Sequence, residues 1–219
     1  MLESIEGNNT MKKLLLILSF VFVSCTNPTN LNTASQYFNG GKHLISQNKW
    51  FDGRMAFARA WDNARVGGGK QSMIAVYAYE YGRASGAICS WKQAEKGLLK
   101  ALNLDKKTNG PIHMTYVELA RMYHAQGLLG KSNKYFSLGK VELDKLPLDK
   151  IDVIAYTKIL DEYVNVLSKL KKYQEAKLIK KRSNHVRNTY RNRKNLTDFT
   201  PYGKFCHQKE KTSKLKISN

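Results

Sequence analysis

Apolar residues recur at helical spacing along most of the chain, and a repeat of about forty residues is superimposed on them. Four large residues serve as reference points for this repeat: Trp50, Trp91, Leu129 and Tyr173. The positions three and ten residues after them are all small, being Gly53, Ala94, Ser132, Ala176, Ala60, Ala101, Gly139 and Ser183. The positions nine residues before them are small in three of the four units (Gly41, Gly82 and Ala120), and the fourth is Val164.

This pattern predicts a pair of antiparallel helices in each unit. Small residues let two helix backbones approach closely, and the large residues fill the space between one pair and the next. Because neither helix of a pair can bury its apolar stripe alone, we expect four stacked pairs to form one continuous core. Asn48 and Gly127 tolerate a left-handed backbone and mark turns inside pairs, and Asn109-Gly110-Pro111 marks a boundary between units.

The third unit is the closest match to a known repeat, with the sequence YVELARMY at residues 116–123 followed by Gly127, Leu129, Ser132, Phe136 and Gly139. These residues resemble the tetratricopeptide repeat (TPR), and the second unit, from Ala78 to Ala101, is similar to it as well. The resemblance covers about residues 34–190, although the units are longer than the ~34 residues of that family. It implies an all-α fold, a right-handed superhelix of about four antiparallel helix pairs.

The N-terminus carries a signal-peptide pattern, with a basic start at Met11 and an apolar run at residues 14–23. At ~1.5 Å per helical residue this run is too short to cross a ~30 Å hydrocarbon core. Residues 1–10 are polar and acidic, so we expect Met11 to be the true start. The run ends in Val-Ser-Cys at Cys25, which resembles the lipobox of bacterial lipoproteins and implies lipidation of Cys25. Ordinary signal-peptidase cleavage is the alternative.

These features divide the chain into a signal peptide (1–24), a polar tether (25–33), helical repeats (34–190) and a basic C-terminal tail (191–219). By the same resemblance, the protein is expected in the bacterial cell envelope, lipid-anchored and facing the periplasm. The outer membrane is favoured if the host has one, because Thr26 rather than Asp follows Cys25.

Positive charge is concentrated at the C-terminal end of the chain. The formal net charge is +20, and residues 169–219 carry 16 Lys and Arg against three Asp and Glu. The residues proposed to bind anions are Lys180, Lys181, Arg182, Arg187, Arg191, Arg193 and Lys194. With the aromatic residues between them they could bind nucleic acid, or an anionic lipid or polymer; a merely solubilising tail is the third interpretation. The signal peptide makes nucleic acid the less favoured of these partners.

The first helix of each pair lines the concave face of such a superhelix, and residues three or four apart on it point the same way. The candidate partner-binding groove consists of Phe38, Lys42, Tyr79, Arg83, Val117, Arg121, His124 and Asn165. The resemblance implies that this groove binds an extended peptide or a partner helix, with the cations contacting carboxylates. Alternatively, these are ordinary solvated positions in a basic protein.

We find no pattern typical of catalysis. Residues 67–72 (GGGKQS) lack the spacing and hydroxyl of a phosphate-binding loop, and no HExxH or CxxC motif supports a metal site. We therefore expect no enzyme activity, no cofactor and no metal.

The remaining cysteines, Cys89 and Cys206, could form a disulfide in an oxidising compartment that attaches the tail to the second repeat. Because the sequence does not give the distance between their Cα atoms, we favour the interpretation as two independent thiols, Cys89 in a turn and Cys206 in a loose tail.

The sequence thus predicts an envelope-located scaffold for protein–protein interaction that supports assembly of a membrane, secretion, pilus or cell-wall complex. The alternative is a protein that binds nucleic acid or an anionic polymer through its basic C-terminal quarter.

Overall fold

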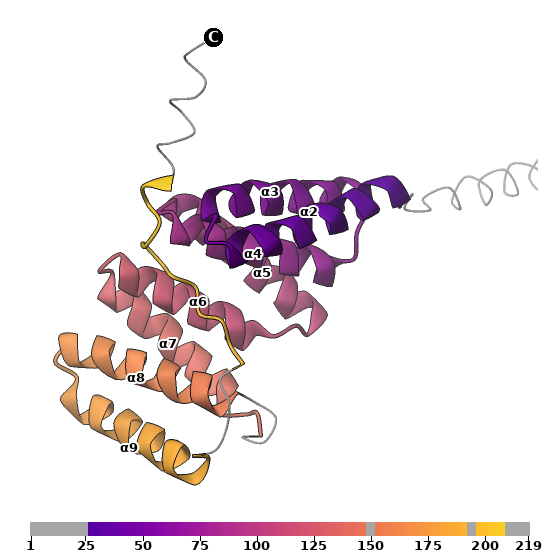
Figure 1. Ribbon diagram of the computed structural model, residues 1–219. Coiled ribbons are helices and arrows are strands. Elements are labelled where there is room, and N and C mark those ends of the chain that lie inside the picture. Colours follow the sequence, from indigo (N-terminus) through magenta and orange to yellow (C-terminus); the bar gives the residue numbers. More distant parts are fainter. Residues whose placement is uncertain (1–25, 148–151, 192–195, 209–219) are drawn as a thin grey trace, which may run out of the picture.

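The computed structural model describes residues 26–147, 152–191 and 196–208. The predicted signal peptide, Cys25, Arg193 and Lys194 lie outside these ranges. The described helices are α2 (Pro28–Ser46), α3 (Trp50–Val66), α4 (Gln71–Ala87), α5 (Trp91–Thr108), α6 (Ile112–Ala125), α7 (Leu129–Leu143), α8 (Val153–Lys169) and α9 (Tyr173–Thr189) (Figure 1). Within the described ranges there is no strand, and the predicted all-α fold is confirmed.

The four reference residues of the repeat are the first residues of α3, α5, α7 and α9, so each unit is one antiparallel pair as predicted. Close backbone approach inside a pair is clearest between α4 and α5. A Cβ on Gly82 would lie 2.8 Å from the backbone nitrogen of Leu98, and one on Gly97 would lie 2.8 Å from the carbonyl oxygen of Ala78. Small side chains at these positions are therefore a steric requirement of the pairing.

The turn inside each pair contains one residue with a left-handed backbone, two positions before the reference residue. These residues are Asn48 (φ 60°), Cys89 (φ 61°), Gly127 (φ 75°) and Lys171 (φ 60°). The predicted turns at Asn48 and Gly127 are confirmed. Only glycine adopts this conformation without steric cost, so the other three turns are stabilised by the helices that they join.

Helix α2 begins earlier than the sequence analysis expects. The predicted tether ends at residue 33, but the helix starts at Pro28. The side chain of Asn27 accepts a hydrogen bond from the backbone N–H of Asn30 at 3.2 Å, and Pro28 occupies the first helical turn. Because both features favour helix initiation, the polar composition of residues 28–33 does not prevent a helix.

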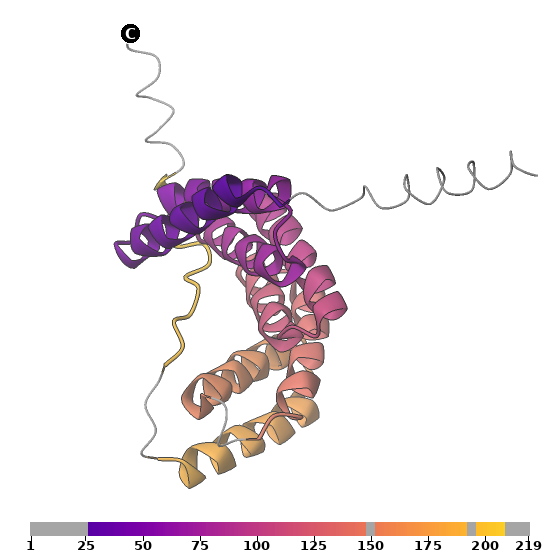
Figure 2. The same ribbon diagram turned by 90° about the vertical axis from the view of Figure 1, so that its right-hand side faces the viewer.

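The helix pairs follow an arc, with α2, α4, α6 and α8 as the first helices of the pairs (Figure 2). Residues 196–208, which we call the C-terminal segment, lie on the inner side of this arc and run from the α8–α9 end toward α2–α5 (Figures 1 and 2). Among the described residues, no helix is both long enough and apolar enough to span a bilayer. The sequence predicts a loose tail around Cys206, but the C-terminal segment is packed on the helices, and most of its backbone is irregular.

Candidate binding groove

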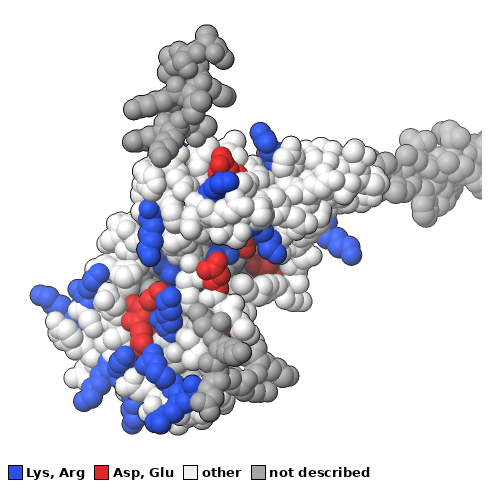
Figure 3. Space-filling view, viewed as in Figure 1, with Lys and Arg blue, Asp and Glu red and all other residues white. Residues whose placement is uncertain are grey.

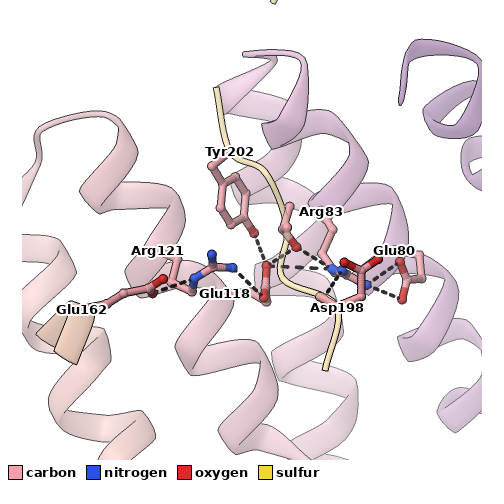
Figure 4. A network of polar contacts seen from close by, with 8 residues as sticks. Glu80, Arg83, Glu118, Arg121, Glu162, Asp198 and Tyr202 are labelled. Carbon is pink, nitrogen blue, oxygen red and sulfur yellow. Dashed lines mark hydrogen bonds and ion pairs between the residues drawn. The ribbon is translucent and has the colours of Figure 1, made fainter. Parts of the chain in front are cut away.

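A row of alternating charges crosses the concave face (Figure 4). Arg83 on α4 binds Glu80 on the same helix at 3.0 Å, and its Nε lies 3.9 Å from an oxygen of Glu118 on α6. Arg121 on α6 binds Glu118 at 3.4 Å and Glu162 on α8 at 2.7 Å. Three successive inner helices are thus joined by one network of ion pairs.

The centre of this network is buried. The side chains of Arg83, Glu118 and Arg121 are only 12%, 8% and 11% exposed. Burial alone would raise the pKa of Glu118, but the guanidinium groups of Arg121 and Arg83, together with hydrogen bonds from Thr200 and Tyr202, hold that pKa below its ordinary value. Burial raises the pKa of Glu80 more than Arg83 lowers it. Glu118 is therefore the stable anion at the centre of the groove.

The C-terminal segment completes the coordination of Glu118. The hydroxyl groups of Thr200 and Tyr202 donate to the same carboxylate oxygen, at 2.6 and 2.7 Å. Arg83 donates to the Thr200 hydroxyl oxygen at 2.6 Å and to the carbonyl oxygen of Asp198 at 3.1 Å. Thr200 is buried, with 1% of its surface exposed. The segment therefore presents two hydroxyl donors to an anion, and one hydroxyl and one carbonyl acceptor to a cation.

Phe199 contacts cations from two helices. The guanidinium of Arg121 lies 4.7 Å from the centre of its ring, and the Nζ of Lys158 on α8 lies 4.0 Å from it. Both distances are in the range of cation–π attraction. Beside this ring, a cavity of about 200 Å³ is lined by Val117, Tyr156 and other residues of α6 and α8.

Asp152, the N-cap of α8, holds the first residues of the segment. One of its oxygens accepts from the backbone N–H of Ala155 at 3.0 Å, as a helix cap does. The other accepts from the N–H groups of Leu196 and Thr197, at 2.7 and 2.8 Å, and from the Thr197 hydroxyl at 2.8 Å. Partial burial of Asp152 raises its pKa, but these donors together lower it below its ordinary value.

The other end of the segment is held mainly by backbone contacts and a covalent bond. The N–H of Gly203 donates to the carbonyl of Gly86 at 3.1 Å, and the N–H of Phe205 donates to that of Ala87 at 2.9 Å. Cys89 and Cys206 form a disulfide, with their Cα atoms 5.0 Å apart. The interpretation of these cysteines as independent thiols is wrong.

Contacts in the turn between α2 and α3 complete this attachment. The side chain of Gln208 donates to the carbonyl of Asn48 at 2.6 Å and accepts from the N–H of Phe51 at 3.1 Å. The ring of Phe205 stacks on Trp50, with centroids 5.9 Å apart. The end of the segment therefore joins the first two helix pairs.

The structure places the predicted groove residues in three settings. Arg83 and Arg121 belong to the buried network, so the alternative that they are ordinary solvated residues is wrong for these two. Lys42 is exposed and lies 5.8 Å from the ring of Phe38, which packs on Phe57 and Tyr77.

Tyr79 and Val117 line the cavity beside Phe199. His124 lies near Lys169, 3.4 Å between the two nitrogens, and its side chain also bonds to Asn165. Contact of the predicted groove residues with a partner stays a prediction.

The predicted anion-binding residues are partly engaged within the chain. Lys and Arg side chains gather at the α9 end of the molecule (Figure 3). Lys180 and Arg187 both bind Asp161, at 3.1 and 2.6 Å, and Arg182 interacts with Tyr156. Lys181 and Arg191 are exposed. Anion binding by this end stays a prediction.

The acidic half of the network was not among the residues predicted from the sequence. Glu80, Glu118 and Glu162 stand eleven residues before their reference residues, each three residues before a predicted groove residue. An acidic residue paired at i, i+3 with a cation in successive units is the signal that indicates an internal network. Thr200 and Tyr202 gave no such signal, because the segment lies outside the repeats.

No family model matches the chain, and no curated protein matches it. Among solved structures, it is similar to BtubC (BKLC) from P. vanneervenii, with a TM-score of 0.68 and 12% identity over 76% of this chain and 67% of that one. It is also similar to a Podosopora anserina putative kinesin light chain with nearly identical TPR-like repeats. Two structures of that protein, the second of them a variant, have TM-scores of 0.59 and 0.60 and identities of 14% and 13%. They cover 84% of this chain, and 87% and 86% of those chains. The chain therefore has a TPR-like fold.

Proposed function

We propose that this protein is a TPR-like scaffold of the bacterial cell envelope that binds a segment of another protein on its concave face. The observation that carries the proposal is the C-terminal segment itself, because the groove already holds an extended peptide through Glu118, Arg83 and Arg121. The curvature of stacked helix pairs creates an extended concave surface, and repeat proteins use such surfaces for binding.

The envelope location rests on the predicted signal peptide and on the lipidation of Cys25. The Cys89–Cys206 disulfide supports an exported protein, because disulfides persist in oxidising compartments and are rare in the cytosol. Helix α2 starts three residues after Cys25, so a lipid on that cysteine would place the α2 end of the superhelix next to the membrane. The α9 end would then be the more distant one.

Binding of nucleic acid by the tail is the less favoured function. Base stacking requires free aromatic faces, but Phe199 lies against two cations and Phe205 lies against Trp50. Asp161 also neutralises part of the charge of Lys180 and Arg187. These contacts would have to be released before the tail could bind a single strand.

Two measurements in the native host test the proposal. Mass spectrometry of the N-terminal peptide should find a di- or triacylated Cys25 in the membrane fraction. A photo-crosslinking residue at Met114, which lines the cavity beside Phe199 and is 45% exposed, should crosslink an envelope protein. The matched control is Leu138 on α7, 37% exposed, which should not. An unmodified N-terminus in the cytoplasm, or equal crosslinking from both positions, would contradict the proposal.

A further inference from the structure

The chemistry of the C-terminal segment indicates which kind of peptide the groove can bind, and this inference rests on the proposed function. We propose that the segment is a displaceable internal ligand, and that the partner is an extended peptide of the same chemistry: a Phe-Thr-Pro-Tyr-like sequence. The Cys89–Cys206 disulfide opposes the exchange by holding the segment in the groove.

The segment is bound largely as a separate peptide would be. Between residues 196 and 202 it is held by hydrogen bonds to Asp152, Glu118 and Arg83, by cation–π contacts to Phe199, and by packing of Tyr202 on an apolar cluster of α5 and α6. Another peptide with the same side chains can replace each of these contacts. The helix pairs also have apolar clusters that contain no residue of the segment, such as the one around Phe136 and Tyr163. Tyr202 and Phe205 each pack at the edge of one of the other two.

The groove sets clear chemical requirements for a replacement. Glu118 accepts two hydroxyl donors from positions two residues apart, Thr200 and Tyr202. Gly86 admits the second ring, because a Cβ there would lie 2.3 Å from a ring carbon of Tyr202. Pro201, between the two hydroxyl residues, brings no N–H that would need a partner. An aromatic residue, a hydroxyl residue, proline and tyrosine in this order satisfy the groove.

The disulfide controls how well a separate peptide can compete. A covalently held segment has a high effective concentration at its site, so a free peptide must exceed that concentration to displace it. Cys206 is exposed and Cys89 is half-buried, so a dithiol can reach the bond at Cys206. One thiolate of the dithiol attacks the sulfur of Cys206 and releases Cys89 as a thiolate. The second thiol closes the dithiol into a cyclic disulfide and leaves both cysteines reduced, a two-electron transfer.

The experiment measures binding of a fluorescein-labelled synthetic peptide of residues 196–208, carrying Cys206→Ser, by fluorescence anisotropy. The protein is the chain from residue 26 onward in three forms: oxidised, Cys89→Ser/Cys206→Ser, and the latter with Phe199→Ala/Tyr202→Ala added. The third form weakens the attachment of the internal segment and leaves the sequence of the helix pairs unchanged. We expect no binding to the oxidised form, weak binding to the second, and at least about tenfold tighter binding to the third.

The matched control lies in the peptide, so it cannot be confused with a folding defect. A peptide with Thr200→Val and Tyr202→Phe keeps its shape but lacks both donors to Glu118. It should bind the third form at least about tenfold more weakly, because a buried carboxylate loses two charge-assisted hydrogen bonds. Equal affinity of the two peptides would overturn the proposal. So would failure of the unmodified peptide to bind a third form whose circular dichroism is unchanged.

These outcomes are distinct from those that test the proposed function. If the peptide does not bind while Met114 still crosslinks an envelope protein, the segment is a fixed part of the fold and the scaffold function stands. If the peptide binds but no envelope protein is crosslinked, the exchangeable groove stands and the scaffold function fails.

Discussion

The two halves of the C-terminal segment are attached by different chemistry. Residues 196–202 are held mostly through side chains, by Asp152, Glu118 and the cations around Phe199. Residues 203–208 are held through backbone hydrogen bonds to the end of α4, through Gln208 and through the disulfide. The first half therefore depends on the identity of its side chains, whereas the second is fixed largely by backbone and covalent bonds. The side chains of the first half would therefore determine which peptide can replace the segment, and the second half attaches the segment to the helices.

Removal of the shared anion should have the largest effect, because Glu118 connects the first half to two inner helices. Glu118→Ala removes the acceptor that Arg83, Arg121 and two hydroxyl donors share, and leaves the two cations with Glu80 and Glu162 as their remaining carboxylates. Breaking a buried ion pair in this way should lower the free energy of unfolding by about 3 to 5 kcal/mol, measured by urea denaturation.

The matched control for that measurement is Asp62→Ala. Asp62 is paired with Arg65 at 3.7 Å on the surface, where both side chains are more than 60% exposed. Its loss should cost less than about 1 kcal/mol. If the two variants were equally stable, the network would not contribute to folding.

Loss of the disulfide should release the second half while the first half stays bound. Cys89 and Cys206 are 117 residues apart, and closing a loop of that size stabilises a fold by about 2 to 5 kcal/mol in chain-entropy models. Cys89→Ser/Cys206→Ser should therefore lower the unfolding temperature by several degrees.

Hydrogen exchange separates the two halves in that variant. The N–H of Phe205 should exchange faster than in the oxidised protein, while the N–H of Thr197, bonded to Asp152, should change little. Equal acceleration at both positions would show that the segment is attached as a single unit.

Adding one methyl group at Gly86 tests the contact at Tyr202, where the two halves of the segment meet. Gly86→Ala would place a Cβ 2.3 Å from the Tyr202 ring, so the ring must move and weaken its bond to Glu118. Overpacking of this kind costs about 1 to 3 kcal/mol, measurable by urea denaturation. In the control Gly40→Ala, no atom lies within 4 Å of the new Cβ. That change should be neutral or stabilising by up to about 1 kcal/mol, since alanine favours the helix.

The repeats could be predicted because their signal occurs four times. Gly82 and Leu98 lie in contact across the turn of one pair, and Gly41 and Phe57 make the same contact at the same offset in another. Each occurrence therefore supports the others, even with a single sequence. The early start of α2 was missed because it depends on one local cap, Asn27, that has no counterpart in the other units.

The C-terminal segment could not be predicted in the same way. Its contacts join residues far apart in the chain, such as Thr200 with Glu118 and Cys206 with Cys89, and each occurs once. A single contact between distant polar residues leaves no periodicity in the sequence. The acidic partners Glu80 and Glu118 were detectable, because they do repeat, but their bound segment was not.

The smallest effect is expected at the start of the segment. Asp152→Asn keeps a good helix cap for α8 but removes the charge that binds Leu196 and Thr197, so it should cost about 0.5 to 1 kcal/mol at pH 7. Because the folded-state pKa of Asp152 is lowered, its contribution is complete above the ordinary value of 3.8 and disappears as pH falls through the folded-state pKa.

The difference between wild type and variant should therefore shrink from pH 7 toward pH 3. Urea denaturation at both pH values measures this difference. Glu118, whose pKa is also lowered, titrates in both proteins, so its contribution cancels when they are compared. A difference that persisted at pH 3 would mean that the Asp152 side chain holds the segment through its shape and hydrogen bonds and not through its charge. The first half of the segment would then depend on charge only around Glu118, and a competing peptide would need no counterpart of its first two residues.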